Sequence, residues 1–177
     1  IVTAISEDSV ISFSVRSLLD PKSPNHILNN PLIEADVTFL EGKHKYNVLK
    51  SAKIISSPYT MSDSLEKLAT ISLLQEATRT LLYEEEQILM FDCLKQCLEG
   101  LKNTNNSVYH IALKYLFKIL KISGNELELG GCVFCNSKKE IKGLSFADGG
   151  LVCKNCIDEK FYSDIPLENI MLFRKCM

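Results

Sequence analysis

Four cysteines in the C-terminal half of the sequence constrain the fold more than any other feature. Cys132, Cys135, Cys153 and Cys156 form the pattern C-x2-C-x17-C-x2-C. Two thiolates separated by two residues can both reach one tetrahedral ion at about 2.3 Å, and the second pair returns on the far side of a hairpin. Because four cysteine ligands leave no open position for water, the pattern predicts one structural zinc ion (Zn2+) per chain.

Other uses of these cysteines stay open at this point. Two disulfides would need an oxidising compartment, and the sequence has no export signal. A redox C-x2-C motif is usually a single pair that follows a strand, whereas an iron–sulfur cluster also takes four cysteines. Cys93 and Cys97, which are spaced i, i+4 on an apolar helix face, are predicted to be packing residues.

The first 58 residues have the composition of β-structure. β-Branched and partly alternating stretches predict strands at residues 1–5, 10–15, 33–40 and 46–55. A segment rich in proline and asparagine, residues 18–31, predicts a loop between the second and third strands. Short strands joined in this way indicate a small barrel or a curled antiparallel sheet.

The rest of the chain is predicted to be helical apart from the cysteine module. Helical periodicity and stop signals place helices at residues 62–82, 84–101 and 107–122, and the start of another at 166–177. No run of about 18 apolar residues occurs, so no membrane-spanning helix is expected. Since the chain opens inside a strand pattern and closes inside a helix pattern, we expect a fragment that lacks residues at both ends.

The cysteine module resembles the zinc-finger region of the RecO family of bacterial recombination mediators. The resemblance lies in Leu129–Cys135 and Leu144–Cys156, and its most specific part is Phe146–Cys153. It implies an α+β chain in which an OB-fold-like barrel at residues 1–58, lacking its first strand, precedes a helical domain at 59–177. The tetracysteine zinc finger, residues 129–160, is then an insertion in the helical domain.

This sequence departs from the family pattern in the barrel. The family usually has a glycine in the turn after its second strand, where this chain has Glu7-Asp8-Ser9, and a glycine after the loop arginine, where it has Ser17. With the first strand absent, one edge of the barrel is expected to be unpaired.

The resemblance implies a non-enzymatic role in recombinational DNA repair. RecO-like proteins bind single- and double-stranded DNA and anneal complementary strands. Together with RecR, they help RecA to load on DNA coated by single-stranded-DNA-binding protein. The implied location is the bacterial cytoplasm, in association with the nucleoid, with no membrane and no small-molecule substrate as partner.

A basic surface on the barrel is the predicted DNA site. The residues expected to contact phosphates are Arg16, Lys22, Lys43 and Lys45. Phe13, Phe39 and Tyr46 could offer planes on which bases stack. The simpler alternative is that these lysines only solvate the outer face of a sheet and that the two phenylalanines belong to its core.

A second basic stripe lies on the third predicted helix. Lys114, Lys118 and Lys121 are spaced i, i+4, i+7 and therefore share one face. The expected partner is the acidic tail of single-stranded-DNA-binding protein, which RecO-like proteins take in their helical domain. The alternative is a solvated face of an otherwise buried helix.

Two other classes of function stay open. One is a protein-interaction adaptor whose zinc module only holds a docking surface, without DNA binding. The other is an enzyme, such as a nuclease or transferase bearing a zinc ribbon. The sequence has no glycine-rich phosphate loop and no histidine at ligand spacing to the cysteines, so we expect no enzymatic activity.

Overall fold

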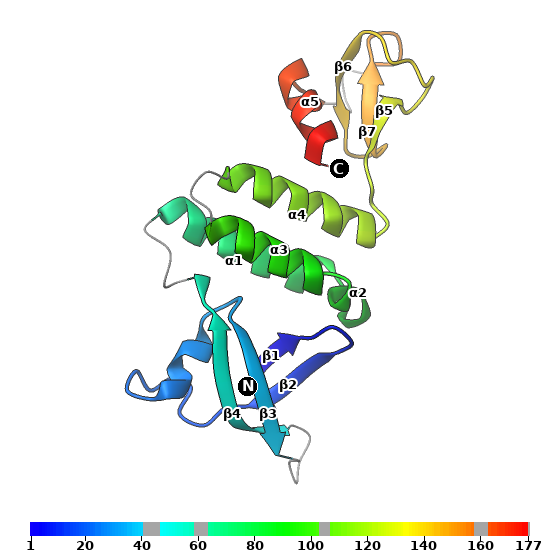
Figure 1. Ribbon diagram of the computed structural model, residues 1–177. Helices are drawn as coiled ribbons and strands as arrows, with labels where there is room; N and C mark the ends of the chain where they lie inside the picture. The colour runs from blue at the N-terminus through cyan, green and yellow to red at the C-terminus, as the bar shows by residue number, and fades with distance from the viewer. Residues whose placement is uncertain (41–46, 59–63, 103–106, 158–162, 177) are drawn as a thin grey trace. The chain divides into compact units, whose positions relative to one another are not determined.

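The computed structural model of the chain describes residues 1–40, 47–58, 64–102, 107–157 and 163–176 (Figure 1). It combines strands and helices in separate regions, which confirms the predicted α+β class. The chain forms two compact units, Ile1–Tyr115 and Leu116–Met177, which are described separately below. The predicted division into a barrel at 1–58 and a helical domain at 59–177 stays a prediction.

A four-stranded mixed sheet opens the first unit. Its strands are β1 (Val2–Ile5), β2 (Val10–Ser14), β3 (Glu34–Leu40) and β4 (Asn47–Ser56), in the order β1-β2-β4-β3. The pairs β1–β2 and β3–β4 are antiparallel, whereas β2 and β4 run parallel. The β1–β2 turn closes without a glycine, because Ser6 N donates to Ser9 O at 2.8 Å and Ser6 Oγ donates to Asp8 Oδ1 at 2.8 Å.

The connection from β2 to β3 is more ordered than the predicted loop. It contains a short 3-10 helix, η1 (Pro24–Asn29), which begins with proline and is capped by Ser23 Oγ, accepting from Asn25 N at 3.2 Å. The side chain of Asn25 donates to Arg16 O at 3.1 Å, and His26 Nδ1 lies 3.0 Å from Leu18 O. These contacts hold the segment against the end of β2.

Helices complete the first unit. They are α1 (Leu65–Leu81), α2 (Glu84–Ile88), α3 (Phe91–Lys102) and the first half of α4 (Val108–Ile122). Their core contains fully buried Leu74, Met90 and Tyr115. Thr78 Oγ1 donates to Leu74 O at 2.7 Å and also hydrogen-bonds the Tyr115 hydroxyl, so the one polar group of this buried tyrosine is satisfied.

The prediction of one helix over residues 84–101 was wrong. The chain breaks there into α2 and α3, because Leu89 N donates to Glu86 O and Met90 N to Gln87 O, which tightens the last turn of α2. The break leaves Leu89 exposed and buries Met90 completely. Periodicity alone could not reveal it, since both residues are apolar.

In the second unit, a small sheet packs against helices. Its strands are β5 (Glu128–Cys132), β6 (Ile141–Ser145), β7 (Gly150–Cys153) and β8 (Ser163–Asp164), in the order β5-β7-β6-β8, followed by α5 (Leu167–Cys176). The core consists of Leu127, Leu129, Leu144, Leu151 and Ile170. Phe117 of α4 packs edge-on against Phe173 of α5, with ring centroids 5.6 Å apart.

Among the helices of the described residues, none is both long enough and apolar enough to cross a bilayer.

Candidate metal centre

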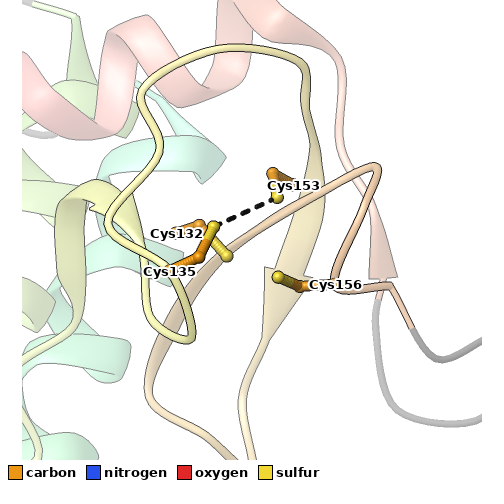
Figure 2. Close-up of side chains that lie close together, drawn as sticks. All are labelled: Cys132, Cys135, Cys153 and Cys156. Carbon is orange, nitrogen blue, oxygen red and sulfur yellow. Dashed lines mark hydrogen bonds between the residues drawn. The ribbon is translucent and has the colours of Figure 1, made fainter.

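The two C-x2-C motifs lie on neighbouring strands of the second unit. Cys132 is the last residue of β5 and Cys135 lies in the turn that follows, whereas Cys153 ends β7 and Cys156 lies in the next turn. Figure 2 shows the four side chains converging on one small volume. All four Sγ atoms lie within 4.8 Å of one another.

This spacing fits a tetrahedral metal ion. With bonds of about 2.3 Å to zinc, neighbouring sulfurs of a tetrahedron are separated by about 3.8 Å. The Sγ atoms of Cys135 and Cys153 are 3.6 Å apart (Figure 2), and the remaining pairs fall below the 4.8 Å limit. The described residues that form this cluster are all cysteines, so the donor set is soft and closed.

Backbone hydrogen bonds shape each cysteine turn. Asn136 N donates to Cys132 O at 2.8 Å, and Cys132 N donates to Ser137 O at 2.9 Å. Asn136 itself adopts a left-handed conformation (φ 58°), which asparagine tolerates better than most residues. The second turn closes similarly, with Cys156 N donating to Cys153 O at 3.1 Å.

Glycines allow the close approach of the strands that carry the cysteines. A Cβ on Gly131 would lie 2.9 Å from Asn136 O, and one on Gly150 would lie 2.5 Å from Glu128 O. Gly149 has a φ of 71° and therefore turns the chain into β7. Gly130 is different, because only the movable carboxylate of Glu128 would meet its Cβ.

The register between β5 and β7 is interrupted next to the cysteines. Glu128 pairs with Gly150 and Cys132 pairs with Leu151, so residues 129–131 bulge out of β5. The polar groups of the bulge are satisfied by side chains: Arg174 Nε donates to Leu129 O at 2.6 Å, and Gly130 N donates to Glu128 Oε1 at 2.6 Å. The bulge thus turns Cys132 toward the second pair of cysteines.

The electrostatic environment favours a thiolate at Cys132. Burial raises the pKa of this thiol, but hydrogen bonds from backbone N–H groups, those of Cys153 and Phe134 among them, outweigh burial and lower the pKa to about 6. The pKa of Cys156 is instead raised to about 12, first by its hydrogen bond with Cys135 and then by burial. Full ionisation of all four thiols therefore needs a cation among them.

The exposure of the cysteines matches a structural site at the edge of a core. Cys132 and Cys153 are buried, Cys156 is partly buried and Cys135 is exposed. The buried pair continues the apolar core of Leu129, Leu144 and Leu151. A cation here would join two turns to that core rather than act on a substrate.

The predicted DNA-contacting residues are only partly described. Arg16 and Lys22 are exposed in the connection from β2 to β3, where Lys22 N donates to Asp20 Oδ1 at 3.0 Å. Lys43 and Lys45, together with Tyr46, lie outside the described residues. The hypothesis that Phe13 offers a stacking plane was wrong, because Phe13 is 1% exposed and packs on Phe39 at a centroid distance of 4.8 Å.

The three lysines predicted to bind a partner are exposed on α4. Lys114 belongs to the first unit, and Lys118 and Lys121 belong to the second. Lys121 Nζ already forms an ion pair with Glu126 Oε1 at 3.0 Å. The charge of Lys121 is therefore partly neutralised within the chain.

One feature of the finger was not predicted from the sequence. Two phenylalanines, Phe134 and Phe146, point largely into solvent. The position of Phe134 between Cys132 and Cys135 could have revealed this, because a short turn around a metal site has little room to bury a large ring.

Comparison with known proteins places the chain among DNA repair proteins. The family model described as "Recombination protein O C terminal" matches residues 62–164, which include all four clustered cysteines. A "DNA repair protein RecO" from Clostridium perfringens (strain SM101 / Type A) is 34% identical over 142 residues, covering 78% of this chain and 62% of that protein.

More distant relatives carry the same name. A "DNA repair protein RecO" from Mycoplasma mycoides is 26% identical over 154 residues, covering 85% of this chain and 62% of that protein. One from Thermoanaerobacter sp. (strain X514) is 25% identical over 152 residues, covering 82% of this chain and 60% of that protein. The chain thus spans less than two thirds of the length of these relatives.

Proposed function

Because the chain belongs to the RecO family of DNA repair proteins, we propose that it works in recombinational repair by binding DNA and annealing complementary strands. The family match over residues 62–164 carries this proposal. The proposed role is non-enzymatic and places the protein in the bacterial cytoplasm with the nucleoid. Its proposed targets are single- and double-stranded DNA.

Within this role, the four cysteines hold one structural zinc ion. The sulfur spacing, the soft donor set and the thiolate-stabilising backbone around Cys132 support this assignment. When bound, the ion supplies a cross-link between the turns after β5 and β7. Paired C-x2-C turns on adjacent strands favour zinc over an iron–sulfur cluster.

The N-terminal sheet is proposed to be part of an OB-fold. In the sheet as described, β1 and β3 are the terminal strands and β2 runs parallel to β4. One additional strand that paired with both terminal strands would produce a closed five-stranded barrel, the strand number of an OB-fold, and would remove both open edges. OB-folds bind oligonucleotides on one face and its neighbouring loops.

Arg16, Lys22, Lys43 and Lys45 are proposed to contact DNA phosphates. The exposure of Arg16 and Lys22, both next to the folded η1 segment, supports the proposal. Contacts of this type release counterions, so each lost phosphate contact should reduce the salt dependence of binding by about one unit of slope.

The stripe of Lys114, Lys118 and Lys121 is proposed to receive the acidic tail of single-stranded-DNA-binding protein. The exposure of all three lysines supports this proposal. Because Lys121 is paired with Glu126, Lys114 and Lys118 would carry most of the interaction. We also propose that the protein acts with RecR to help RecA load on DNA coated by single-stranded-DNA-binding protein.

An annealing assay tests the proposed function. Two complementary labelled oligonucleotides are mixed with the purified protein at low and at high salt, without ATP. We expect rapid annealing that fades as salt rises, and slower annealing by an Arg16→Ala, Lys22→Ala double variant. Lys175→Ala, which removes an exposed charge from α5, is the matched control and should anneal like the wild type.

The outcomes of this assay are distinct. Annealing that is absent at every salt concentration, while the protein is folded and binds one zinc ion, would contradict the proposed function. Annealing with no difference between the double variant and the control would retain the function but remove Arg16 and Lys22 from the DNA surface.

A further inference from the structure

Phe134 is an exposed aromatic side chain in a hydrogen-bonded turn. Its side chain is 56% exposed, although it lies between the clustered residues Cys132 and Cys135. Its backbone N–H bonds the Cys132 sulfur, and the turn is closed by Asn136 N donating to Cys132 O at 2.8 Å. A ring on such a fixed backbone loses little conformational entropy when a flat ligand stacks on it.

Two exposed lysines lie close along the chain to the cysteine cluster. Lys154 lies between Cys153 and Cys156 just as Phe134 lies between the first two cysteines, and the four sulfurs lie within 4.8 Å of one another. Lys154 N donates to Glu140 O at 2.9 Å, which brings Lys139 beside the second turn. Both lysines are exposed, and neither forms an ion pair with another described residue.

The charge of the whole finger sets the balance between stacking and electrostatics. Residues 129–160 contain five lysines against four carboxylates, those of Glu140, Asp148, Asp158 and Glu159. A zinc ion with four thiolates carries a formal charge of −2, which more than offsets this surplus of one. Attraction to phosphate is therefore weak at this surface, and the ring of Phe134 must supply most of the affinity.

We infer that the metal end of the finger, with Phe134 and Lys154 in its two cysteine turns and Lys139 next to Glu140, binds single-stranded DNA by stacking on an unpaired base. The bases of a duplex are already stacked on each other, so this surface discriminates in favour of single strands. The inference rests on the proposed function, since it adds a strand-selective contact to a protein whose barrel is proposed to bind phosphates.

Phe146 provides a matched control on the same finger. It is 69% exposed and lies in the turn between β6 and β7. That turn is at the opposite end of the hairpin from the cysteines, because Ser145 pairs with Gly150 while Ile141 pairs with Cys153. Asp148 lies in the same turn and would repel phosphate, so Phe146 should contribute nothing to DNA binding.

The experiment compares two probes and three variants of the full chain. Fluorescence anisotropy measures binding to a labelled 30-mer of thymidine and to a labelled 30-base-pair duplex at fixed salt. Phe134→Ala should weaken binding to the single strand by about 5- to 150-fold, the loss expected for one stacked base, and leave duplex binding unchanged. Phe134→Trp should retain the affinity, and Phe146→Ala should stay within twofold of the wild type on both probes.

Zinc content and melting temperature of each variant show whether the finger is intact. Loss of single-strand affinity by a folded, zinc-loaded Phe134→Ala protein supports the inference. The inference would be overturned by unchanged single-strand binding in Phe134→Ala, by an equal loss on both probes, or by an equal loss in Phe146→Ala. If single-strand binding is unchanged, the exposed ring would be assigned to a protein partner. A wild-type protein that binds neither probe would refute the proposed function and this inference with it.

Discussion

A single methyl group added at Gly150 should disturb the proposed metal centre. Gly150 begins β7, opposite Glu128 of β5, and lies one residue before Leu151, whose carbonyl accepts from Val133 N at 2.9 Å. A Cβ at Gly150 would lie 2.5 Å from both Glu128 O and Val133 Cγ1. Because Val133 follows Cys132 directly, relief of this overlap must move the first cysteine turn away from the second.

The size of the effect follows from these contacts. Overpacking of this kind costs about 1–3 kcal/mol, and two overlaps, one with backbone, place Gly150→Ala in the upper part of that range. Alanine also lowers the conformational entropy of the unfolded chain, and this offsets about 0.4–1 kcal/mol of the lost stability. A net loss of roughly 1–2 kcal/mol corresponds to about 5- to 30-fold weaker zinc binding, because folding of the finger and binding of the ion are coupled.

Competition with a chromogenic chelator measures this change. Gly130→Ala is the matched control, since its Cβ would meet only the Glu128 carboxylate, at 2.7 Å, and that side chain can move aside. The control should bind zinc within about threefold of the wild type, because the loss of the bond from Gly130 N to Glu128 costs little at an exposed position. Wild-type zinc affinity in Gly150→Ala, or a larger loss in Gly130→Ala, would show that the overlap at Gly150 does not govern zinc binding.

Three further predictions concern stability. Replacement of Cys132 and Cys153 by serine should abolish zinc binding and severely lower the stability of the second unit; unchanged melting of the double variant would count against a structural ion. Leu151→Ala, at a fully buried core position, should cost about 2–5 kcal/mol in chemical denaturation, whereas Leu172→Ala, at 36% exposure, should cost far less; equal losses would contradict the assigned core. Burial raises the pKa of Tyr115, so the unfolded chain loses this proton first and stability should fall as the pH rises above about 10. Tyr115→Phe should reduce that slope in pH-dependent unfolding, and an unchanged slope would exclude this tyrosine as its source.

The clustering of the four cysteines could be predicted from the sequence because its determinants are local. Each pair of cysteines is three positions apart and is preceded by glycines. Such a segment specifies a tight turn independently of the rest of the chain. The structure brings the four side chains together as that pattern required. The bulge at residues 129–131 and its contact with Arg174 were not predictable, since residue 174 lies 45 positions along the chain from Leu129.

The sheet and the helices show where local patterns fail. The parallel pairing of β2 with β4 joins strands that are separated by another strand in the sequence, which alternation of residue types cannot indicate. The break between α2 and α3 depends on whether Leu89 or Met90 enters the core, and both are apolar. Residue type alone also does not decide burial for Phe13 and Phe134, because the first is buried in a core and the second is exposed on a turn.

X-ray absorption at the zinc edge of the purified full chain tests the metal centre most directly. We predict one zinc ion per chain with a single shell of four sulfur atoms at about 2.3 Å. A shell that contains nitrogen or oxygen, or a protein that contains iron in place of zinc, would contradict it.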